Sequence, residues 1–292
     1  MLAVLMAGVF QAFPARAVVI TNWNFMLDAG FTAFAPSPGV DGSANNAFLS
    51  GFNGVIATTG GSVDFSTIGD APSTLTWGQD IGSGRSSLVV GGTNGQVSGS
   101  LTTNGGPVNT LTLTHNNIRT GAPTLTSASL FNVLALDPEG SGAVAGPSDA
   151  FQIPALIFPI HFLETPNLMN VNDCVVSSPV ACNDIFVIDV LASGFSTTDN
   201  SFNQNFTYMG ETYNAKLLLS GLSTLSDAAC AAVLGAGNNG CIGFTTVERQ
   251  SNTFQASLQI DSVPSPVLEP TSLALFGFGL TGLGFMRRRR LS

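Results

Sequence analysis

Oxygen-bearing side chains gather around one pair of cysteines in the second half of the chain. They are Glu164, Asn167, Asn172, Asp173, Asn183 and Asp184, around Cys174 and Cys182. Calcium takes six to eight oxygen ligands from loops of this kind. The pattern raises the hypothesis of a calcium site with Glu164, Asp173 and Asp184 as carboxylate ligands. A solvated acidic loop explains the same residues without an ion, so the expected cofactor is none, with calcium as the alternative.

Histidine is the second residue type that could carry chemistry, and the chain has only His115 and His161. Two histidines cannot form a three-histidine zinc site, although histidine combined with carboxylates stays open. His115 shares one face of an alternating segment with Leu111 and Leu113. A buried, hydrogen-bonded imidazole is the simplest interpretation of that position. We therefore expect His115 to be structural rather than a ligand or a catalytic group.

No arrangement typical of an enzyme appears in the chain. The Gly-x-Ser-x-Gly pattern of a nucleophile elbow is absent. Two glycine-rich stretches, Gly82-Ser83-Gly84 and Gly91-Gly92, are followed by neither a helix pattern nor a lysine, which argues against phosphate binding. Glycoside hydrolysis needs two facing carboxylates, and the spacing of the acidic residues singles out no pair. We expect no enzymatic activity and no catalytic residue.

The charge of the chain excludes one class of partner. Between Val18 and Pro270 there are four basic and 18 acidic residues, a net charge of −14. Such a surface repels phosphate backbones, so nucleic acid is not an expected partner. Cations or a hydrated polymer matrix fit this charge better. Trp23, Trp77 and the many phenylalanines could form a platform for stacking sugars, although most aromatic side chains of a β-sandwich lie in its core.

The four cysteines form two close pairs in the sequence, and neither pair has the CxxC spacing of a zinc site. Four cysteines allow three pairings, and proximity favours the two local ones. We therefore predict disulfides Cys174–Cys182 and Cys230–Cys241, which form in an oxidising compartment.

The elements that must position these residues are mostly strands. Alternation with a period of two predicts half-buried strands over Ser251–Ser262 and Val108–His115. Continuous apolar runs over Phe151–Glu164, Asp184–Val190 and Tyr213–Leu219 indicate more deeply buried strands.

Apart from these strands, the sequence predicts one short helix around Leu225–Leu234. Charged residues make up only 9% of the chain, and Gly, Asn and Pro punctuate the strands. This composition is typical of an extracellular all-β protein. We predict a single β-sandwich or jelly-roll-like domain over residues 18–261.

Both ends of the chain have a different character. Residues 1–17 begin with an apolar stretch, Met1 to Phe10, and end in Ala15-Arg16-Ala17, the pattern of a signal peptide cleaved before Val18. Residues 262–270 form a proline-rich linker, and residues 271–292 contain an apolar, glycine-rich segment before four arginines. The 16 residues from Thr271 to Met286 would extend about 24 Å as a helix, slightly short of a comfortable membrane span. The arginines would hold the C-terminus on the cytoplasmic side.

This tail resembles the PEP-CTERM sorting signal. The recognition motif stands as Val267, Leu268, Glu269 and Pro270, and the basic cluster as Arg287, Arg288, Arg289 and Arg290. One position departs from the pattern, because Leu268 replaces the first proline. The resemblance implies transient membrane insertion and cutting by exosortase, a membrane transpeptidase of bacteria that make extracellular polysaccharide. An ordinary membrane anchor is the alternative for the tail.

The body is similar to the THxN family of PEP-CTERM proteins. The signature stands as Thr114, His115, Asn116 and Asn117. Similar stretches are Leu75–Gly78, Glu164–Asn167, Cys182–Phe186, Cys241–Phe244 and Thr246–Glu248. The resemblance covers most of the mature chain and implies a location at the cell surface or in the matrix, but it implies no activity.

Together these observations predict an exported, non-enzymatic protein of a Gram-negative-type bacterium. It would cross the inner membrane, be processed by exosortase, and reside at the cell surface or in the extracellular matrix, associated with exopolysaccharide or biofilm. The alternative is a carbohydrate-binding module that acts on the cell's own polysaccharide.

Overall fold

The computed structural model of the protein describes residues 18–45, 55–58, 61–64, 71–139, 151–153, 155–166, 174–176, 182–189, 195–196 and 198–264. The predicted signal peptide, sorting motif and C-terminal segment lie outside these residues. By its internal contacts the chain divides into two compact units, Met1–Ser262 and Val263–Ser292.

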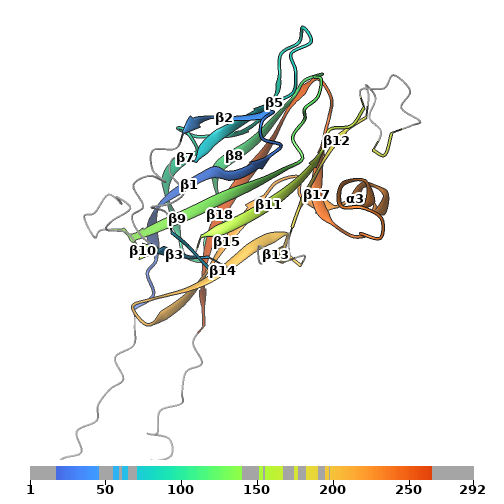
Figure 1. Ribbon diagram of the computed structural model, residues 1–292. Coiled ribbons are helices and arrows are strands. Elements are labelled where there is room, and N and C mark those ends of the chain that lie inside the picture. The colour runs from blue at the N-terminus through green and yellow to red at the C-terminus, as the bar shows by residue number, and fades with distance from the viewer. Residues whose placement is uncertain are drawn as a thin grey trace, which may run out of the picture. The chain divides into compact units, whose positions relative to one another are not determined.

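The first unit is an all-β, sandwich-like fold of two curled antiparallel sheets (Figure 1). The first sheet runs, in spatial order, β16 (Ser223–Thr224), β17 (Ile242–Thr246), β12 (Asp184–Ile188), β11 (Leu156–Leu163), β9 (Ser127–Pro138), β1 (Asn22–Ala35) and β7 (Gln96–Thr102). A further short strand, β10 (Phe151–Gln152), also pairs with β9.

The second sheet runs β13 (Phe195–Ser196), β14 (Ser201–Tyr208), β15 (Glu211–Leu219), β18 (Gln250–Val263), β8 (Val108–Asn117), β6 (Ser86–Val90), β5 (Pro72–Trp77) and β2 (Val40–Asn45). A separate hairpin is formed by β3 (Val55–Thr58) and β4 (Gly61–Asp64). The all-β prediction is therefore confirmed.

Side-chain alternation explains why these segments are strands. In β8, buried side chains alternate with partly exposed ones from Leu111 to Asn117. In β11 the same alternation holds over the whole strand, which lies between β9 and β12 inside its sheet. The segment predicted as one strand, Phe151–Glu164, is two strands, because β10 and β11 pair with different parts of β9.

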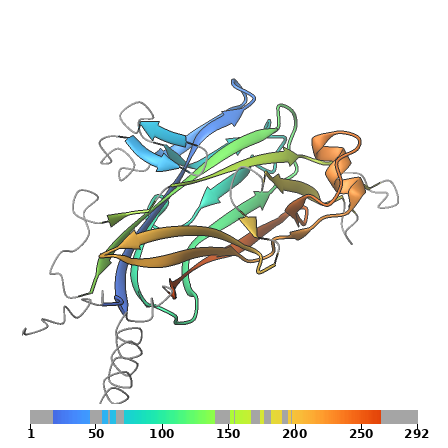
Figure 2. The ribbon, with the colours of Figure 1, turned by 90° about the horizontal axis from the view of Figure 1, so that it is seen from below.

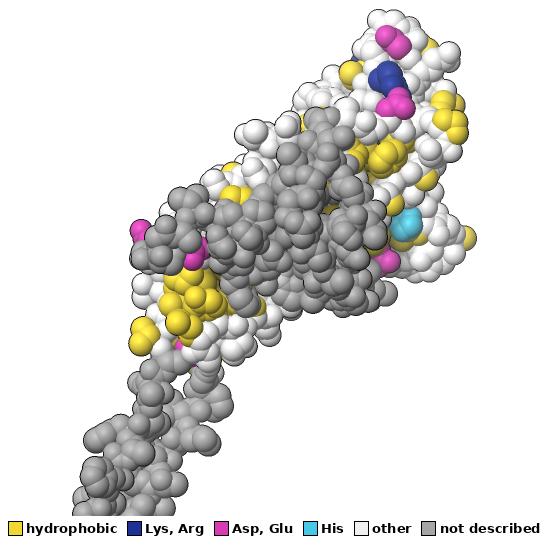
Figure 3. All heavy atoms as spheres, turned by 60° about the vertical axis from the view of Figure 1, so that its left-hand side comes forward, with side chains coloured by type: hydrophobic (Ala, Val, Ile, Leu, Met, Phe, Trp, Pro, Cys, Tyr) yellow, Lys and Arg dark blue, Asp and Glu magenta, His cyan; other side chains and the backbone are white. Residues whose placement is uncertain are grey.

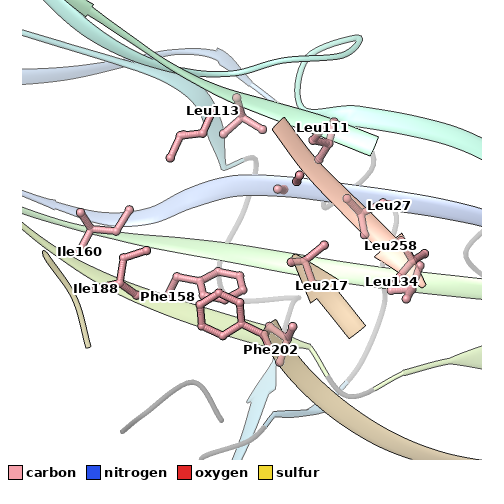
Figure 4. Close-up of a cluster of buried hydrophobic side chains, with 14 of the residues drawn as sticks. Leu27, Leu111, Leu113, Leu134, Phe158, Ile160, Ile188, Phe202, Leu217 and Leu258 are labelled. Carbon is pink, nitrogen blue, oxygen red and sulfur yellow. The ribbon is translucent and has the colours of Figure 1, made fainter. Parts of the chain in front are cut away.

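The core lies between the two sheets and draws on both of them. Figure 4 shows side chains of β1, β9 and β11 facing those of β8, β15 and β18. Leu27, Phe158 and Ile160 come from the first sheet, and Leu113 and Leu258 from the second. A fully buried side chain of this size contributes about 1.5–3 kcal/mol through the hydrophobic effect, so this layer holds the sheets together.

The predicted helix is present as α3 (Asp227–Leu234). Ser226 caps its start by accepting a hydrogen bond from the Ala229 backbone amide at 3.2 Å. Ala229 packs against Ile185 and Val187 of β12, on the face of that strand away from the main core. In Figures 1 and 2, α3 lies at one end of the sandwich beside β17. Among the described residues, no helix has the length and apolar character needed to cross a membrane.

Candidate functional site

Polar and aromatic side chains meet between the two sheets near the end of the sandwich where β11, β12 and β17 approach β5 and β8. We call this group the polar seam. It consists of Trp77, His115, Asn117, Glu164, Asp184, Thr246 and Glu248. Its members lie near, at or just beyond strand ends. Buried polar groups need hydrogen-bond partners, and the apolar middle of the core offers none.

Three hydrogen bonds cross from one sheet to the other within the seam. The indole nitrogen of Trp77 donates to Glu164 Oε2 at 3.1 Å. His115 Nδ1 lies 2.9 Å from the Thr246 hydroxyl, and Asn117 Nδ2 donates to the Thr246 carbonyl oxygen at 3.5 Å. These bonds join β5 and β8 to the ends of β11 and β17, so the seam ties the sheets together.

His115 is completely buried, as the sequence predicts. Its ring stacks on Trp77 with centroids 5.4 Å apart, and the edges of Phe162 and Phe186 approach it at 5.6 and 5.0 Å. Burial lowers the pKa of His115 to about 3, so the imidazole is neutral near pH 7. A neutral ring held by aromatic neighbours and one hydroxyl is what a structural histidine requires.

Three carboxyl groups, which we call the acid trio, lie together beside this ring. Glu164, Asp184 and Glu248 each place a carboxyl oxygen within 4.8 Å of the others. Two of the side chains are enclosed, since Asp184 is 0% exposed and Glu248 only 1%, whereas Glu164 is partly exposed. Thr165 donates to Asp184 Oδ1 twice, from its backbone amide at 2.8 Å and its hydroxyl at 3.2 Å. The trio can hold a cation or share protons.

Electrostatics make three negative charges at this place unfavourable. Burial raises the pKa of Asp184, and the neighbouring Glu164 raises it further. Burial likewise raises the pKa of Glu164, which the Trp77 hydrogen bond partly offsets. Burial raises the pKa of Glu248 too, and Arg249, the Asn117 side chain and Arg119 oppose that rise. Neutralisation by protons or by a bound ion is therefore needed at neutral pH.

The four residues Thr114, His115, Asn116 and Asn117 divide between the two faces of β8. His115 and Asn117 point into the seam, whereas Thr114 and Asn116 face outward. Thr114 Oγ1 lies 3.0 Å from Thr253 Oγ1, and Asn116 Nδ2 donates to Ser87 Oγ at 3.0 Å. The outward pair therefore belongs to a polar ladder across β6, β8 and β18.

A polar hollow of about 730 Å³ borders the seam. We call it the arginine hollow, because Arg119 and Arg249 line it together with Ser83, Ser87, Asn116, Asn117, Ile118, Gln250 and Ser251. Asn117 belongs to both the hollow and the seam, and its side chain hydrogen-bonds Glu248. Both arginines are exposed.

The structure brings together part of the predicted calcium ligand set and adds to it. Glu164 and Asp184 lie in the acid trio, whereas Asp173, Asn167 and Asn172 are outside the described residues. The third member, Glu248, was not predicted as a ligand. It follows Asp184 by 64 positions, so no local spacing connects the two. The only signal was its place in one of the stretches that carry the family resemblance.

Both predicted disulfides are present, Cys174–Cys182 and Cys230–Cys241. They indicate an oxidising, extracytoplasmic environment. The second one connects α3 to the residue before β17, so it fixes the chain close to the strand that carries Thr246.

The structure contradicts the hypothesis that the two tryptophans form a platform for stacking sugars. Trp23 and Trp77 are both 0% exposed, and each indole N–H is used inside the fold. Trp23 donates to Thr103 Oγ1 at 3.0 Å and packs edge-on against Tyr213. Buried indoles of this kind stabilise a core and cannot form a platform for a ligand.

The seam therefore combines residues from five of the stretches that support the resemblance to the THxN family. These stretches are spread over 171 positions, from Trp77 to Glu248. Comparison with known protein families gives no match, and comparison with curated proteins gives none either.

Proposed function

We propose that this chain is an exported, non-enzymatic protein of the bacterial cell surface or extracellular matrix. In this proposal a signal peptide at residues 1–17 sends it across the inner membrane. The C-terminal segment at 271–292 inserts transiently into the membrane as a helix, and an exosortase removes it. The observation that carries export is the pair of disulfides, since such bonds persist outside the reducing cytoplasm.

The character of the surface supports an extracellular role. Charged side chains are sparse on the described part of the face in Figure 3, which is mostly backbone and side chains that are neither charged nor hydrophobic, with some hydrophobic patches. Such a protein stays hydrated through hydroxyl and amide groups, which suits a polysaccharide matrix. Burial of Asp184 and Glu248 supports a non-enzymatic role, because a sugar cannot reach two carboxyl groups whose residues are at most 1% exposed.

The test is mass spectrometry of the mature C-terminus from a host with and without its exosortase. We expect a chain that ends near Pro270 only when the enzyme is present. Glu269→Gln should block the cut, whereas Ser265→Ala, a change of similar size in the same linker, should leave it unchanged. Surface-displayed protein from the complete host that still carries Arg290 would make the tail a plain anchor.

The arginine hollow favours a second candidate function, binding of an acidic polysaccharide. Only four basic residues lie in the mature chain, and two of them line this one hollow. Arg85 and Lys216 form salt bridges with Asp41 and Asp261, at 2.7 and 2.9 Å. Arg119 and Arg249 have no such salt bridge within the described part of the chain, and both are exposed. Although both attract the Glu248 carboxyl, their guanidinium groups can also bind a carboxylate of a sugar acid.

Binding of hyaluronate oligosaccharides, compared with neutral dextran oligosaccharides, tests this second function. The double variant Arg119→Gln with Arg249→Gln should lose most of the hyaluronate binding, and Arg85→Gln should retain it. Equal binding of the acidic and neutral sugars, or no effect of the double variant, would contradict the assignment of the hollow.

A further inference from the structure

The spacing of the acid trio matches the inner shell of a single calcium ion. Calcium–oxygen distances are about 2.3–2.6 Å, so two ligands of one ion lie at most about 5 Å apart. The carboxyl oxygens of Glu164, Asp184 and Glu248 all lie within 4.8 Å of one another. Three side chains from separate parts of the sequence thus meet within one coordination sphere.

In two of the three carboxyl groups, one oxygen accepts hydrogen bonds from protein groups and the other has no hydrogen-bond partner. Thr165 holds Asp184 Oδ1, and the Trp77 indole holds Glu164 Oε2. Asp184 Oδ2 and Glu164 Oε1 are buried and have no hydrogen-bond partner in the described structure. Donors that fix one oxygen of a carboxylate and leave the other free are typical of the outer shell of a metal site.

A fourth group, independent of the carboxyls, points to a ligand at the same place. Asn117 is 1% exposed, and its side chain contacts Glu248. Its amide oxygen is buried and lacks a partner among the described residues. A buried carbonyl oxygen without a donor carries a desolvation cost that no hydrogen bond offsets. A cation between Asn117 and the trio would remove that cost and satisfy the two free carboxyl oxygens.

The chemistry of the four ligand groups favours calcium over zinc and magnesium. All four groups offer oxygen, and no cysteine or histidine atom is part of the trio in the described structure, which disfavours zinc. The free oxygens of Asp184 and Glu164, the two carboxyl oxygens of Glu248 and the Asn117 amide oxygen supply up to five ligands, and water can complete the six to eight that calcium accepts. Magnesium demands a near-ideal octahedron, whereas calcium accepts the irregular ligand set that these four side chains provide.

We propose that Glu164, Asp184, Glu248 and Asn117 bind one calcium ion that joins the two sheets at the polar seam. The ion would connect the end of β8 to the start of β12 and to the turn between β17 and β18. Calcium would therefore lock this end of the sandwich once the protein reaches the calcium-containing exterior. This site differs from the sequence hypothesis in that Glu248 and Asn117 contribute.

Thermal unfolding and isothermal titration with calcium on the exported, disulfide-bonded protein test the proposal. After chelation and dialysis, calcium at about 100 times its Kd should raise Tm by roughly 5–10 °C. Titration should give one ion per chain. Glu248→Gln should abolish both effects, yet it should leave the calcium-free protein at least as stable, because it removes one of three repelling carboxyls. Glu211→Gln, at the partly exposed start of β15, is the matched control and should respond like the wild type.

Terbium luminescence locates the ion. Trp77 donates a hydrogen bond to a proposed ligand, so it should sensitise Tb³⁺ emission, and calcium should displace the signal. Trp77→Phe should lose the emission, whereas Trp23→Phe, which alters the other buried indole, should keep it. No Tm shift and no binding heat in the wild type would overturn the proposal and leave the trio neutralised by protons. Binding that survives Glu248→Gln would overturn it as well.

Discussion

Replacing His115 by alanine perturbs the centre of the polar seam. The imidazole fills the space between Trp77, Phe162 and Phe186, and it binds the hydroxyl of Thr246. His115→Ala would leave a cavity enclosed by three aromatic rings and a buried hydroxyl without its partner. The loss should therefore combine packing with a cross-sheet hydrogen bond.

The structure sets the size of this effect. Removing a buried aromatic side chain costs about 3–5 kcal/mol, and the lost hydrogen bond about 1 kcal/mol more. His115 Nε2 is buried without a partner in the described structure, so its removal returns a similar amount. We expect a net loss of about 3–5 kcal/mol in the free energy of unfolding. The depressed pKa keeps the ring neutral near pH 7, so no charge is lost there.

Urea unfolding at neutral pH with the disulfides intact measures this loss. Thr114→Ala is the control, because Thr114 lies on the outward face of the same strand and its bond to Thr253 is exposed. Its effect should stay within about 1 kcal/mol. If His115→Ala unfolds at the wild-type urea concentration, the packing argument is wrong. A stable His115→Ala variant that lost ligand binding would assign the ring a functional role instead.

Three further predictions follow from other parts of the fold. Burial raises the pKa of Asp28 from 3.8 to about 8, so the folded state keeps a proton that the unfolded state releases, and stability falls as pH rises across this range. Between about pH 5 and 7 the wild type should therefore lose up to about 3 kcal/mol more than Asp28→Asn, and equal pH slopes in urea unfolding would contradict this. Cys230→Ser combined with Cys241→Ser should cost about 2–3 kcal/mol in the same assay, and no loss would show that the loop is held by other contacts. Gly243→Ala should prevent β12 and β17 from pairing, since its Cβ would collide with a backbone carbonyl of β12, and soluble, disulfide-bonded protein at wild-type yield would refute this.

Much of the fold could be predicted because its causes are local in the sequence. Alternation along Val108–His115 and Ser251–Ser262 places one face of each segment in an apolar environment, and β8 and β18 result. The capping serine before Asp227 and the small apolar residues after it favour the helix. The disulfides were predictable too, since short loops pair more readily than long ones.

The candidate site depends instead on contacts between residues that are distant in the sequence. Periodicity predicted that His115 would be buried, but not that Trp77 and Thr246 would lie against it. The acidic residues that flank the Cys174–Cys182 loop suggested Asp173 beside Asp184, whereas the fold brings Glu248 to Asp184 through the turn after β17. Composition could not decide whether the tryptophans face solvent or the core.

Local pattern and composition are enough to predict the all-β class, the main strands, the two disulfides and the excess of acidic charge. Which acidic groups lie together, and how far they are from water, depends instead on how the chain folds. Strand order and register bring the ends of β5, β8, β11, β12 and β17 together, and no local spacing encodes that arrangement. The physical reason is that burial and Coulomb interactions depend on distance in space, and the packing of the two sheets sets that distance.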